Sequence, residues 1–231
     1  MAKIKFGSMV SQASGSVSGV TFSHNRYGAY TRRRAIPVKS VTVYALAAKG
    51  RLAQASQAWG LLQPEGRAAW RTWAQTNPVT DALGDSQVLT GHAAFVQLNC
   101  RLTGHAETAI LVPPVGPPPL GLQALAGTFD IGSGDFELTW DNDPLGGDEH
   151  AEVWAAVVDE TGRAYVENLY KMCAYGAAAT TSGFDTSSDI ALRFGTLMIG
   201  QYVFIKARVF NDKTGLVSGW SVVQGVVIDT P

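Results

Sequence analysis

One acidic stretch has the spacing of a calcium-binding loop. In DNDPLGGDEHAE, residues 141–152, loop positions 1, 3, 6, 9 and 12 are Asp141, Asp143, Gly146, Glu149 and Glu152. Position 5 is Leu145, which offers no oxygen ligand. The flanking segments also have the pattern of strands, whereas a calcium loop of this type joins two helices. We therefore interpret the stretch as a solvated acidic turn, with Asp141, Asp143 and Glu152 as the alternative metal candidate.

Other motifs that could carry out catalysis are absent from the sequence. It contains no P-loop, no dinucleotide-binding glycine pattern after a strand, no zinc-protease motif and no nucleophile-elbow serine. The histidines, His24, His92, His105 and His150, do not occur at metal-ligand spacing. Cys100 and Cys173 are too isolated for a disulfide framework, although one bridge between them stays open. A non-enzymatic protein without a cofactor is therefore predicted.

A basic, glycine-punctuated segment, residues 15–34, is predicted to form a β-hairpin. In GSVSGVTFSHNRYGAYTRRR, Val20 and Phe22 share one face of a first strand, residues 24–28 are turn-like, and a second strand follows. An isolated two-stranded hairpin is marginal in water, so other strands of the chain or other subunits must complete it. The predicted partner-binding residues of this arm are Val20, Phe22, Arg26, Tyr27, Tyr30, Arg32, Arg33 and Arg34.

The distribution of charge indicates what the arm binds. Residues 1–64 contain nine lysines and arginines and no acid, whereas residues 126–231 contain six basic and fifteen acidic residues, within a net charge of −1. A basic arm favours an acidic surface. Arg32 to Arg34 with Tyr27 and Tyr30 could instead contact nucleic acid, but consecutive arginines of a strand point to alternate faces and no nucleic-acid-binding fold is recognisable. A protein surface is the preferred partner.

Three helices are predicted after the arm. Residues 41–62 have apolar residues at three- and four-residue steps, a second helix starts at Pro64 and ends at Asn77, and Thr90 is the expected N-cap of a third helix that ends near Gly104. Trp59, Trp70 and Trp73 are predicted to form the small core of the hairpin of the first two helices rather than to bind a ligand. This helical region has about 60 residues, which is close to the lower limit for a domain that is stable by itself.

The remaining sequence predicts a linker and a β-sandwich. Residues 110–120, ILVPPVGPPPL, favour an extended spacer or, as the alternative, a ligand for an aromatic groove. Alternating segments then predict strands at 136–140, 151–158, 164–176, 189–194, 201–210 and 217–228, around a core of Trp140, Val153, Tyr202 and Val209. The expected fold class is α+β multidomain, divided into an arm (1–40), a helical region (41–104), a linker (105–125) and an antiparallel sandwich (126–231).

The sandwich region resembles fibronectin type III domains, which are immunoglobulin-like. The residues that carry the resemblance are Trp140 in LTWDND and, in YVFIKARVFNDKTGLVS, Tyr202, Ala207, Val209, Asn211, Gly215 and Ser218. The chain departs from the family before this tyrosine, where no proline precedes Gly200. The resemblance covers about 106 residues and implies a two-sheet fold.

The first 100 residues resemble a group of small structural proteins of phages and prophages. The similar segments are the arm, SQAWGLLQPEGRAAWRTWA and LTGHAAFVQLNCRL. The resemblance implies a component of a tailed-phage virion, assembled in the host bacterial cytoplasm. No run of the sequence approaches the length of a membrane span, so no membrane segment is expected. We expect a homo-oligomeric capsid cement or decoration protein that binds other virion proteins, the major capsid protein above all. The alternatives are a tail or neck component and a carbohydrate-binding or adhesive module, for which Trp154, Trp220 and Tyr165 are the available aromatic residues.

Overall fold

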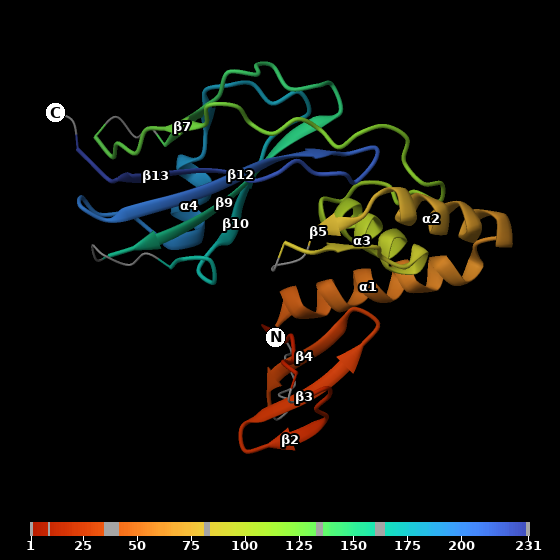
Figure 1. The fold of residues 1–231 in the computed structure, drawn as a ribbon. Helices are drawn as coiled ribbons and strands as arrows, with labels where there is room; N and C mark the ends of the chain where they lie inside the picture. The colour runs from red at the N-terminus through yellow and green to blue at the C-terminus, as the bar shows by residue number, and fades with distance from the viewer. Residues whose placement is uncertain are drawn as a thin grey trace. The chain divides into compact units, whose positions relative to one another are not determined.

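The computed structural model describes residues 2–8, 10–34, 42–80, 84–132, 136–159 and 165–229 (Figure 1). The chain divides into two compact units. The first unit comprises residues 1–100 with 111–113, and the second comprises residues 101–110 with 114–231. No helix among the described residues is both long and apolar enough to cross a membrane. Residues 35–41, where the arm was predicted to join the helices, lie outside the described ranges.

The arm forms a four-stranded antiparallel sheet. Its strands are β1 (Ala2–Lys3), β2 (Gly15–Val17), β3 (Val20–Asn25) and β4 (Gly28–Arg33), in the order β1-β4-β3-β2. The predicted hairpin is thus completed by strands of the same chain. Its turn contains two residues rather than the five predicted, because Asn25 accepts a hydrogen bond from the Tyr27 amide at 2.9 Å and Gly28 takes φ +111°.

The three helices are α1 (Val43–Leu61), α2 (Pro64–Thr76) and α3 (Gly91–Gly104). The predicted ends of α2 and α3 are confirmed, because Pro64 opens α2, Asn77 caps its end, and the Thr90 hydroxyl accepts a hydrogen bond from the Ala93 amide at 3.0 Å. Between α2 and α3, the predicted loop contains a two-stranded sheet of β5 (Val79–Thr80) and β6 (Ser86–Gln87).

Phe95 lies at the centre of the helical core. Its ring lies 5.5 Å from Trp59 and 5.3 Å from Trp70, and Trp70 contacts Trp73 at 5.7 Å between ring centroids. The tryptophans therefore pack partly through a phenylalanine of α3 rather than only on one another. Trp70 is fully buried, and its indole N–H donates to the Leu111 carbonyl at 2.9 Å. Leu52, one of the apolar residues at three- and four-residue steps that predicted the first helix, is 53% exposed.

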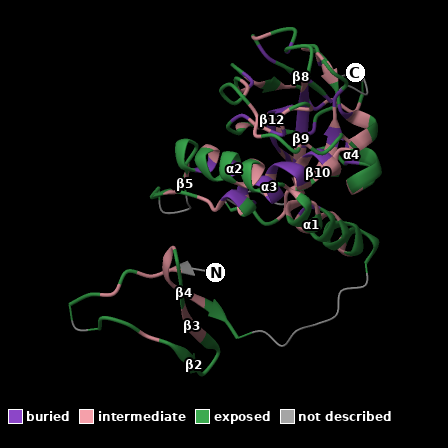
Figure 2. Cartoon of the chain, turned by 90° about the vertical axis from the view of Figure 1, so that its right-hand side faces the viewer, coloured by how far each residue is buried: buried purple, intermediate pink, exposed green. Residues whose placement is uncertain are grey.

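The second unit contains two antiparallel sheets around one core, which confirms a mixed fold of helices and antiparallel sheets. One sheet has the order β10-β9-β12-β13 and the other has the order β11-β8-β7. Their elements are β7 (Ala126–Gly127), β8 (Glu137–Thr139), β9 (Glu149–Val158), β10 (Lys171–Tyr175), β11 (Phe184–Asp185), β12 (Tyr202–Asn211) and β13 (Ser221–Val226). Buried residues of both sheets form one cluster (Figure 2).

Two details of the predicted sandwich are wrong. The strand predicted at residues 189–194 is part of a helix, α4 (Ser187–Phe194), in which Ile190 is buried while Leu192 is 88% exposed. Ile190 and Phe194 share a face at four-residue spacing, which suits a helix better than the alternation assumed. Tyr202 lies outside the core because β12 presents Val203, not Tyr202, to it; Trp140, Val153 and Val209 are core residues as predicted.

Part of the predicted linker belongs to the second unit. His105 stacks on Tyr175 with 4.1 Å between ring centroids, and its side chain is 9% exposed. Further along, Leu122 is buried in the core shared by the two sheets. Both residues lie within the range 105–125 that was predicted to be a spacer, so the folded unit extends to the N-terminal side of residue 126.

A pair of fragments tests this boundary. We expect residues 101–231 to unfold cooperatively and at a higher temperature than residues 126–231. The shorter fragment loses Leu122 from the core, and removing a buried leucine side chain typically costs about 2–5 kcal/mol. It also uncovers the face on which His105 packs. Differential scanning calorimetry of both fragments measures the difference; equal melting temperatures would show that residues 101–125 do not stabilise the unit.

Candidate functional site

The arm sheet has no buried side chain in its three longer strands. Every residue of β2, β3 and β4 is exposed or half-buried, including the apolar Val17 and Val20, which are 69% and 39% exposed (Figure 2). A sheet normally buries one face against another layer. The arm therefore presents both polar and apolar surface to whatever binds it.

Strand pairing distributes the predicted arm residues over both faces. Val20 pairs with Arg33 and Phe22 pairs with Thr31, so these four lie on one face. Tyr30 pairs with Ser23 and Arg32 with Thr21 on the other face. Both faces thus combine a cation with apolar or aromatic surface, and the prediction that consecutive arginines alternate is confirmed.

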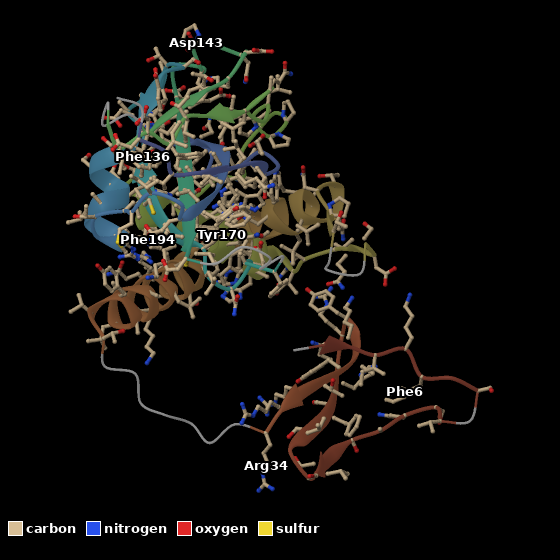
Figure 3. All side chains as sticks on the ribbon, turned by 90° about the vertical axis from the view of Figure 1, so that its left-hand side faces the viewer. Phe6, Arg34, Phe136, Asp143, Tyr170 and Phe194 are labelled. Atoms are coloured by element: carbon tan, nitrogen blue, oxygen red, sulfur yellow. The ribbon has the colours of Figure 1, made fainter. Side chains whose placement is uncertain are left out.

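The turn and the end of the hairpin carry the other predicted residues. The Arg26 guanidinium lies over the Tyr27 ring, 5.0 Å from its centroid. Arg34 follows β4, where its amide donates to the Gly19 carbonyl at 2.8 Å, and its side chain extends away from the sheet (Figure 3). Arg26 and Arg34 are therefore at opposite ends of β4.

The edges of the arm sheet are short. The edge strand β2 has three residues and pairs only with Val20 to Phe22 of β3. The backbone groups of Ser23 to Asn25 on that side have no strand beside them among the described residues. Such an edge can accept a strand from another protein through main-chain hydrogen bonds.

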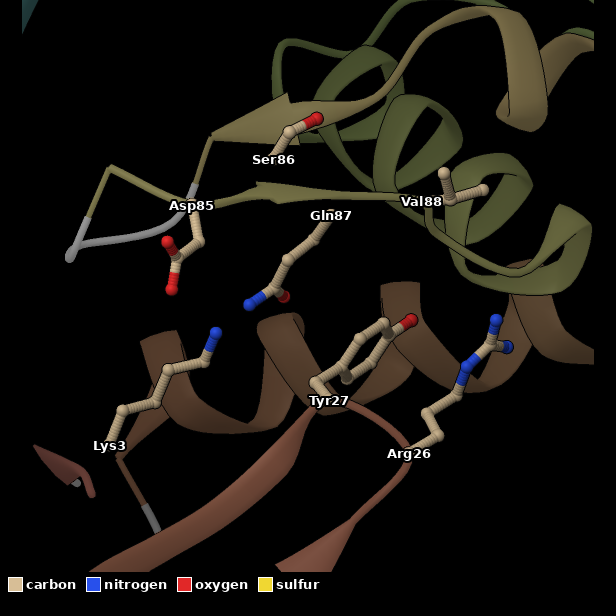
Figure 4. Close-up of a pocket in the computed structure, with 7 residues that line it drawn as sticks. All are labelled: Lys3, Arg26, Tyr27, Asp85, Ser86, Gln87 and Val88. Atoms are coloured by element: carbon tan, nitrogen blue, oxygen red, sulfur yellow. The ribbon is translucent and has the colours of Figure 1, made fainter. Parts of the chain in front are cut away.

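An open hollow of about 390 Å³ adjoins the hairpin turn within the first unit (Figure 4). Its walls combine arm residues with residues of β6 and the segment around it: Lys3, Arg26, Tyr27, Asp85, Ser86, Gln87 and Val88. The nearby Lys5 ammonium lies 3.5 Å from the Asp85 carboxylate, and both side chains are largely exposed. Ion pairs this exposed contribute little to stability, so this contact is a weak restraint on the arm.

The second unit carries a buried charge cluster on the face of β9 and β12 that points away from the core. Glu152 of β9 is 2% exposed, and Arg208 of the neighbouring β12 donates to its two oxygens at 2.8 and 3.1 Å. The Trp154 indole N–H donates to the same carboxylate at 2.7 Å. The pKa of Arg101 is lowered to about 10, because the effects of burial and of the positive charge of Arg208 outweigh the opposing effect of Glu152. Burial also lowers the pKa of His105, whose Nε2 lies 4.0 Å from Glu152.

Aromatic rings surround the next cation along β12. The Lys206 ammonium lies 4.3 Å from the centroid of Tyr170, 5.0 Å from that of Trp220 and 5.8 Å from that of Trp154. Trp220 also covers the Arg208 guanidinium at 4.4 Å. Trp154 and Trp220, the aromatics considered for a glycan-binding face, are thus engaged by cations of the same sheet, while Tyr165 is 70% exposed.

Two carboxylates of the predicted acidic loop accept hydrogen bonds from backbone amides of the same unit. Asp143 accepts a hydrogen bond from the Ser182 amide at 2.6 Å, and Glu149 accepts one from the Gly146 amide at 2.9 Å. Glu152 lies in β9 rather than in a loop, and it accepts a hydrogen bond from Arg208. Asp143 lies at the opposite end of the second unit from Tyr170 (Figure 3). Among the described residues, Asp141, Asp143 and Glu152 do not form a group that could hold one ion.

Lys206 and Arg208 were not predicted as site residues, and Glu152 and Trp154 were considered only for a metal site and for a glycan-binding face. A partial signal existed, because Lys206 and Arg208 are two residues apart in an otherwise apolar strand and therefore share a face. Their partners Glu152 and Trp154 have the same spacing 54 residues earlier, but only the register of β9 with β12 brings the pairs together. Cys100 and Cys173 are both free thiols, and burial raises the pKa of each.

Comparisons with known proteins give little similarity. No protein-family model matches the chain, and no curated protein matches it. Among solved structures, the crystal structure of a Fn3-like protein from Clostridium thermocellum is similar to part of it. That structure is 13% identical, the match covers 50% of this chain and 97% of the other, and the TM-score is 0.31.

Proposed function

We propose that the protein is a non-enzymatic structural component of a phage particle, a capsid cement or decoration protein, which binds the major capsid protein through its N-terminal arm. The observation that carries this proposal is the arm sheet, whose longer strands contain cations and exposed apolar residues but no buried side chain. The resemblance of the first 100 residues to phage structural proteins is the reason for proposing a phage particle as the assembly.

The chemistry of the arm suits an acidic protein surface. The charged residues of the arm (residues 1–40) are Lys3, Lys5, Lys39 and the arginines at 26 and 32–34, and residues 1–64 contain no acid. Electrostatic attraction would bring the arm to the surface, while Phe22, Tyr30 and added main-chain hydrogen bonds would hold it there. Repetition of this contact around a symmetric particle makes a homo-oligomeric arrangement the natural one.

The second unit is proposed to be a fibronectin type III-like sandwich that faces solvent. Supporting features are Trp140 in the shared core and the turn after β12, in which Asn211 accepts hydrogen bonds from the amides of Lys213 and Thr214 at 3.1 and 2.9 Å. Ser218 reinforces this end by accepting a hydrogen bond from the Val209 amide at 2.9 Å. With its excess of acidic residues, the unit would be repelled by the acidic surface that attracts the arm.

Two other roles are less well supported. A tail or neck component would use the same arm and differs only in the partner. A glycan-binding module would need free aromatic rings, and those of Trp154 and Trp220 contact Lys206 and Arg208 instead.

Replacing Arg32, Arg33 and Arg34 together by serine tests the role of the arm's charge. We expect attachment to particles of the same phage or prophage, stripped of this protein, to become roughly tenfold slower at low salt, because steering raises association rates by about 10–10³. The dependence of the rate on salt should flatten as well, since exposed charges are screened over about 8 Å at physiological ionic strength. Surface plasmon resonance on immobilised particles measures both effects.

A matched control replaces three cations outside the arm, Lys171, Arg193 and Lys213, by serine. These residues belong to the second unit, so attachment should be unchanged. A titration with fluorescent single-stranded DNA under the same conditions measures whether the arm binds nucleic acid instead of a protein surface. Strong DNA binding without attachment to particles, or equal salt dependence in the arm variant and the wild type, would contradict the proposal.

A further inference from the structure

Three side chains from separate parts of the second unit meet beside the charge cluster. Glu107 follows α3, His150 is the second residue of β9, and Asp212 comes directly after β12. His150 pairs with Phe210 in the β9–β12 register, which places His150 and Asp212 at the same end of neighbouring strands. One ligand atom from each of the three residues lies within 4.8 Å of the other two.

The ring of His150 is oriented as in a metal ligand. Its Nδ1 lies 2.9 Å from the Gly176 carbonyl, which can only accept a hydrogen bond, so Nδ1 carries the proton. In the neutral ring, Nε2 then has a free lone pair. This Nε2 is buried, has no hydrogen-bond partner, and lies 3.6 Å from the Asp212 carboxylate. Metal-bound histidines almost always donate their other N–H to such a carbonyl or carboxylate.

Two further buried polar atoms without a hydrogen-bond partner lie beside His150. One oxygen of Asp212 accepts from the exposed Lys213 at 2.9 Å, while Oδ1 is buried without a hydrogen-bond partner. Tyr175 stacks on His150 at 4.7 Å, and its hydroxyl is also buried without a partner. Buried polar atoms without partners are rare in folded proteins, so three in one place point to a missing ligand.

We infer that Glu107, His150 and Asp212 bind one divalent transition-metal ion, with Zn²⁺ as the cation that fits best. One imidazole nitrogen and two carboxylate oxygens suit Zn²⁺, whereas Ca²⁺ and Mg²⁺ prefer oxygen ligands alone. Ligands about 2 Å from a shared ion lie roughly 3–4 Å apart, so the three side chains need to move together by about 1 Å. Glu107 is only half-buried, which leaves an open side for entry of the ion and for a water as fourth ligand.

The site would act as a structural clamp within the second unit. Glu107 belongs to the segment 101–110, whereas His150 lies in β9 and Asp212 directly follows β12. A bound ion would therefore hold that segment against the sheet, beside the stacked rings of His105 and Tyr175. This role does not depend on the proposed attachment to a phage particle.

Isothermal titration of the full chain with zinc chloride, after removal of metals with EDTA, tests the inference. We expect one saturable site per chain, binding of Ca²⁺ and Mg²⁺ at least a hundredfold weaker, and a higher melting temperature with Zn²⁺. Asp212→Asn and Glu107→Gln should each weaken Zn²⁺ binding at least tenfold while keeping side-chain shape. Glu107 is half-buried, so its substitution should not disturb folding. The Glu107 variant therefore still tests the site if the substitution at Asp212 impairs folding.

The matched controls are Asp141→Asn, an exposed carboxylate in the same unit, and Cys173→Ser, a thiol that could bind zinc elsewhere. Both should bind Zn²⁺ like the wild type. Absence of saturable binding at millimolar zinc would show that Glu107, His150 and Asp212 do not form a metal site. Equal affinity in the wild type and in both ligand variants, or tighter binding of Ca²⁺ than of Zn²⁺, would equally overturn the inference.

Discussion

Replacing Arg208 by methionine should destabilise the second unit by about 3–5 kcal/mol. Methionine keeps most of the side-chain volume but removes the guanidinium that donates two hydrogen bonds to Glu152. The Glu152 carboxylate, 2% exposed, would then be buried with only the Trp154 indole as a close donor. Removing one partner of a buried ion pair typically has this cost because the other charge loses its closest partner. Arg101, whose pKa Glu152 raises, remains as a second cation, so we expect the lower end of this range. Urea denaturation, with hydrogen exchange resolved for peptides of β9 and β12, measures the loss.

The double variant Arg208→Met, Glu152→Gln is the control for this interpretation. Glutamine is neutral and can still accept the hydrogen bond from Trp154, so the double variant should recover about half of the stability lost in Arg208→Met alone. Lys213→Met, which removes an exposed cation of the same unit, should change the stability by less than about 1 kcal/mol. If Arg208→Met behaved like Lys213→Met, the buried pair would not stabilise this sheet.

The elements of the fold could be predicted wherever a local signal determined them. Pro64 and Thr90 marked helix starts because their effect on the first turn is local. Alternation identified β9 and β12, whose inward residues are buried in a single core. The same rule failed at residues 189–194, where Ile190, Leu192 and Phe194 alternate by chance and the exposed Leu192 shows that the segment is helical.

The contacts between distant residues could not be predicted. The arm was expected to need additional strands, but nothing in the local pattern indicated that β1 and β2 of the same chain supply them. Likewise, Glu107, His150 and Asp212 have no metal-ligand spacing and meet only through the register of β9 with β12 and the position of segment 101–110. The acidic loop, with its favourable spacing, uses its carboxylates to cap backbone amides instead.

Deleting residues 1–40 should abolish attachment to stripped particles. The deletion removes all four strands of the arm sheet, and with them the exposed edge of β3, the apolar Val17 and Val20, and the arginines at 32–34. Unlike the arginine-to-serine variant, which changes mainly the charge, it removes the main-chain and apolar contacts as well. We therefore expect a loss of more than a hundredfold in affinity at every salt concentration, measured by co-sedimentation with particles.

The same deletion should leave the second unit intact, because every residue of its core cluster lies between Leu122 and Val227, outside the deleted segment. Its melting temperature should match that of the full chain within about 1 °C, which separates loss of binding from loss of folding. A second variant, Val17→Lys with Val20→Lys, adds charge to the arm while removing apolar surface. If the apolar contacts slow dissociation, it should associate as fast as the wild type and dissociate faster. Full occupancy of particles by the deleted form would show that another part of the chain is the anchor.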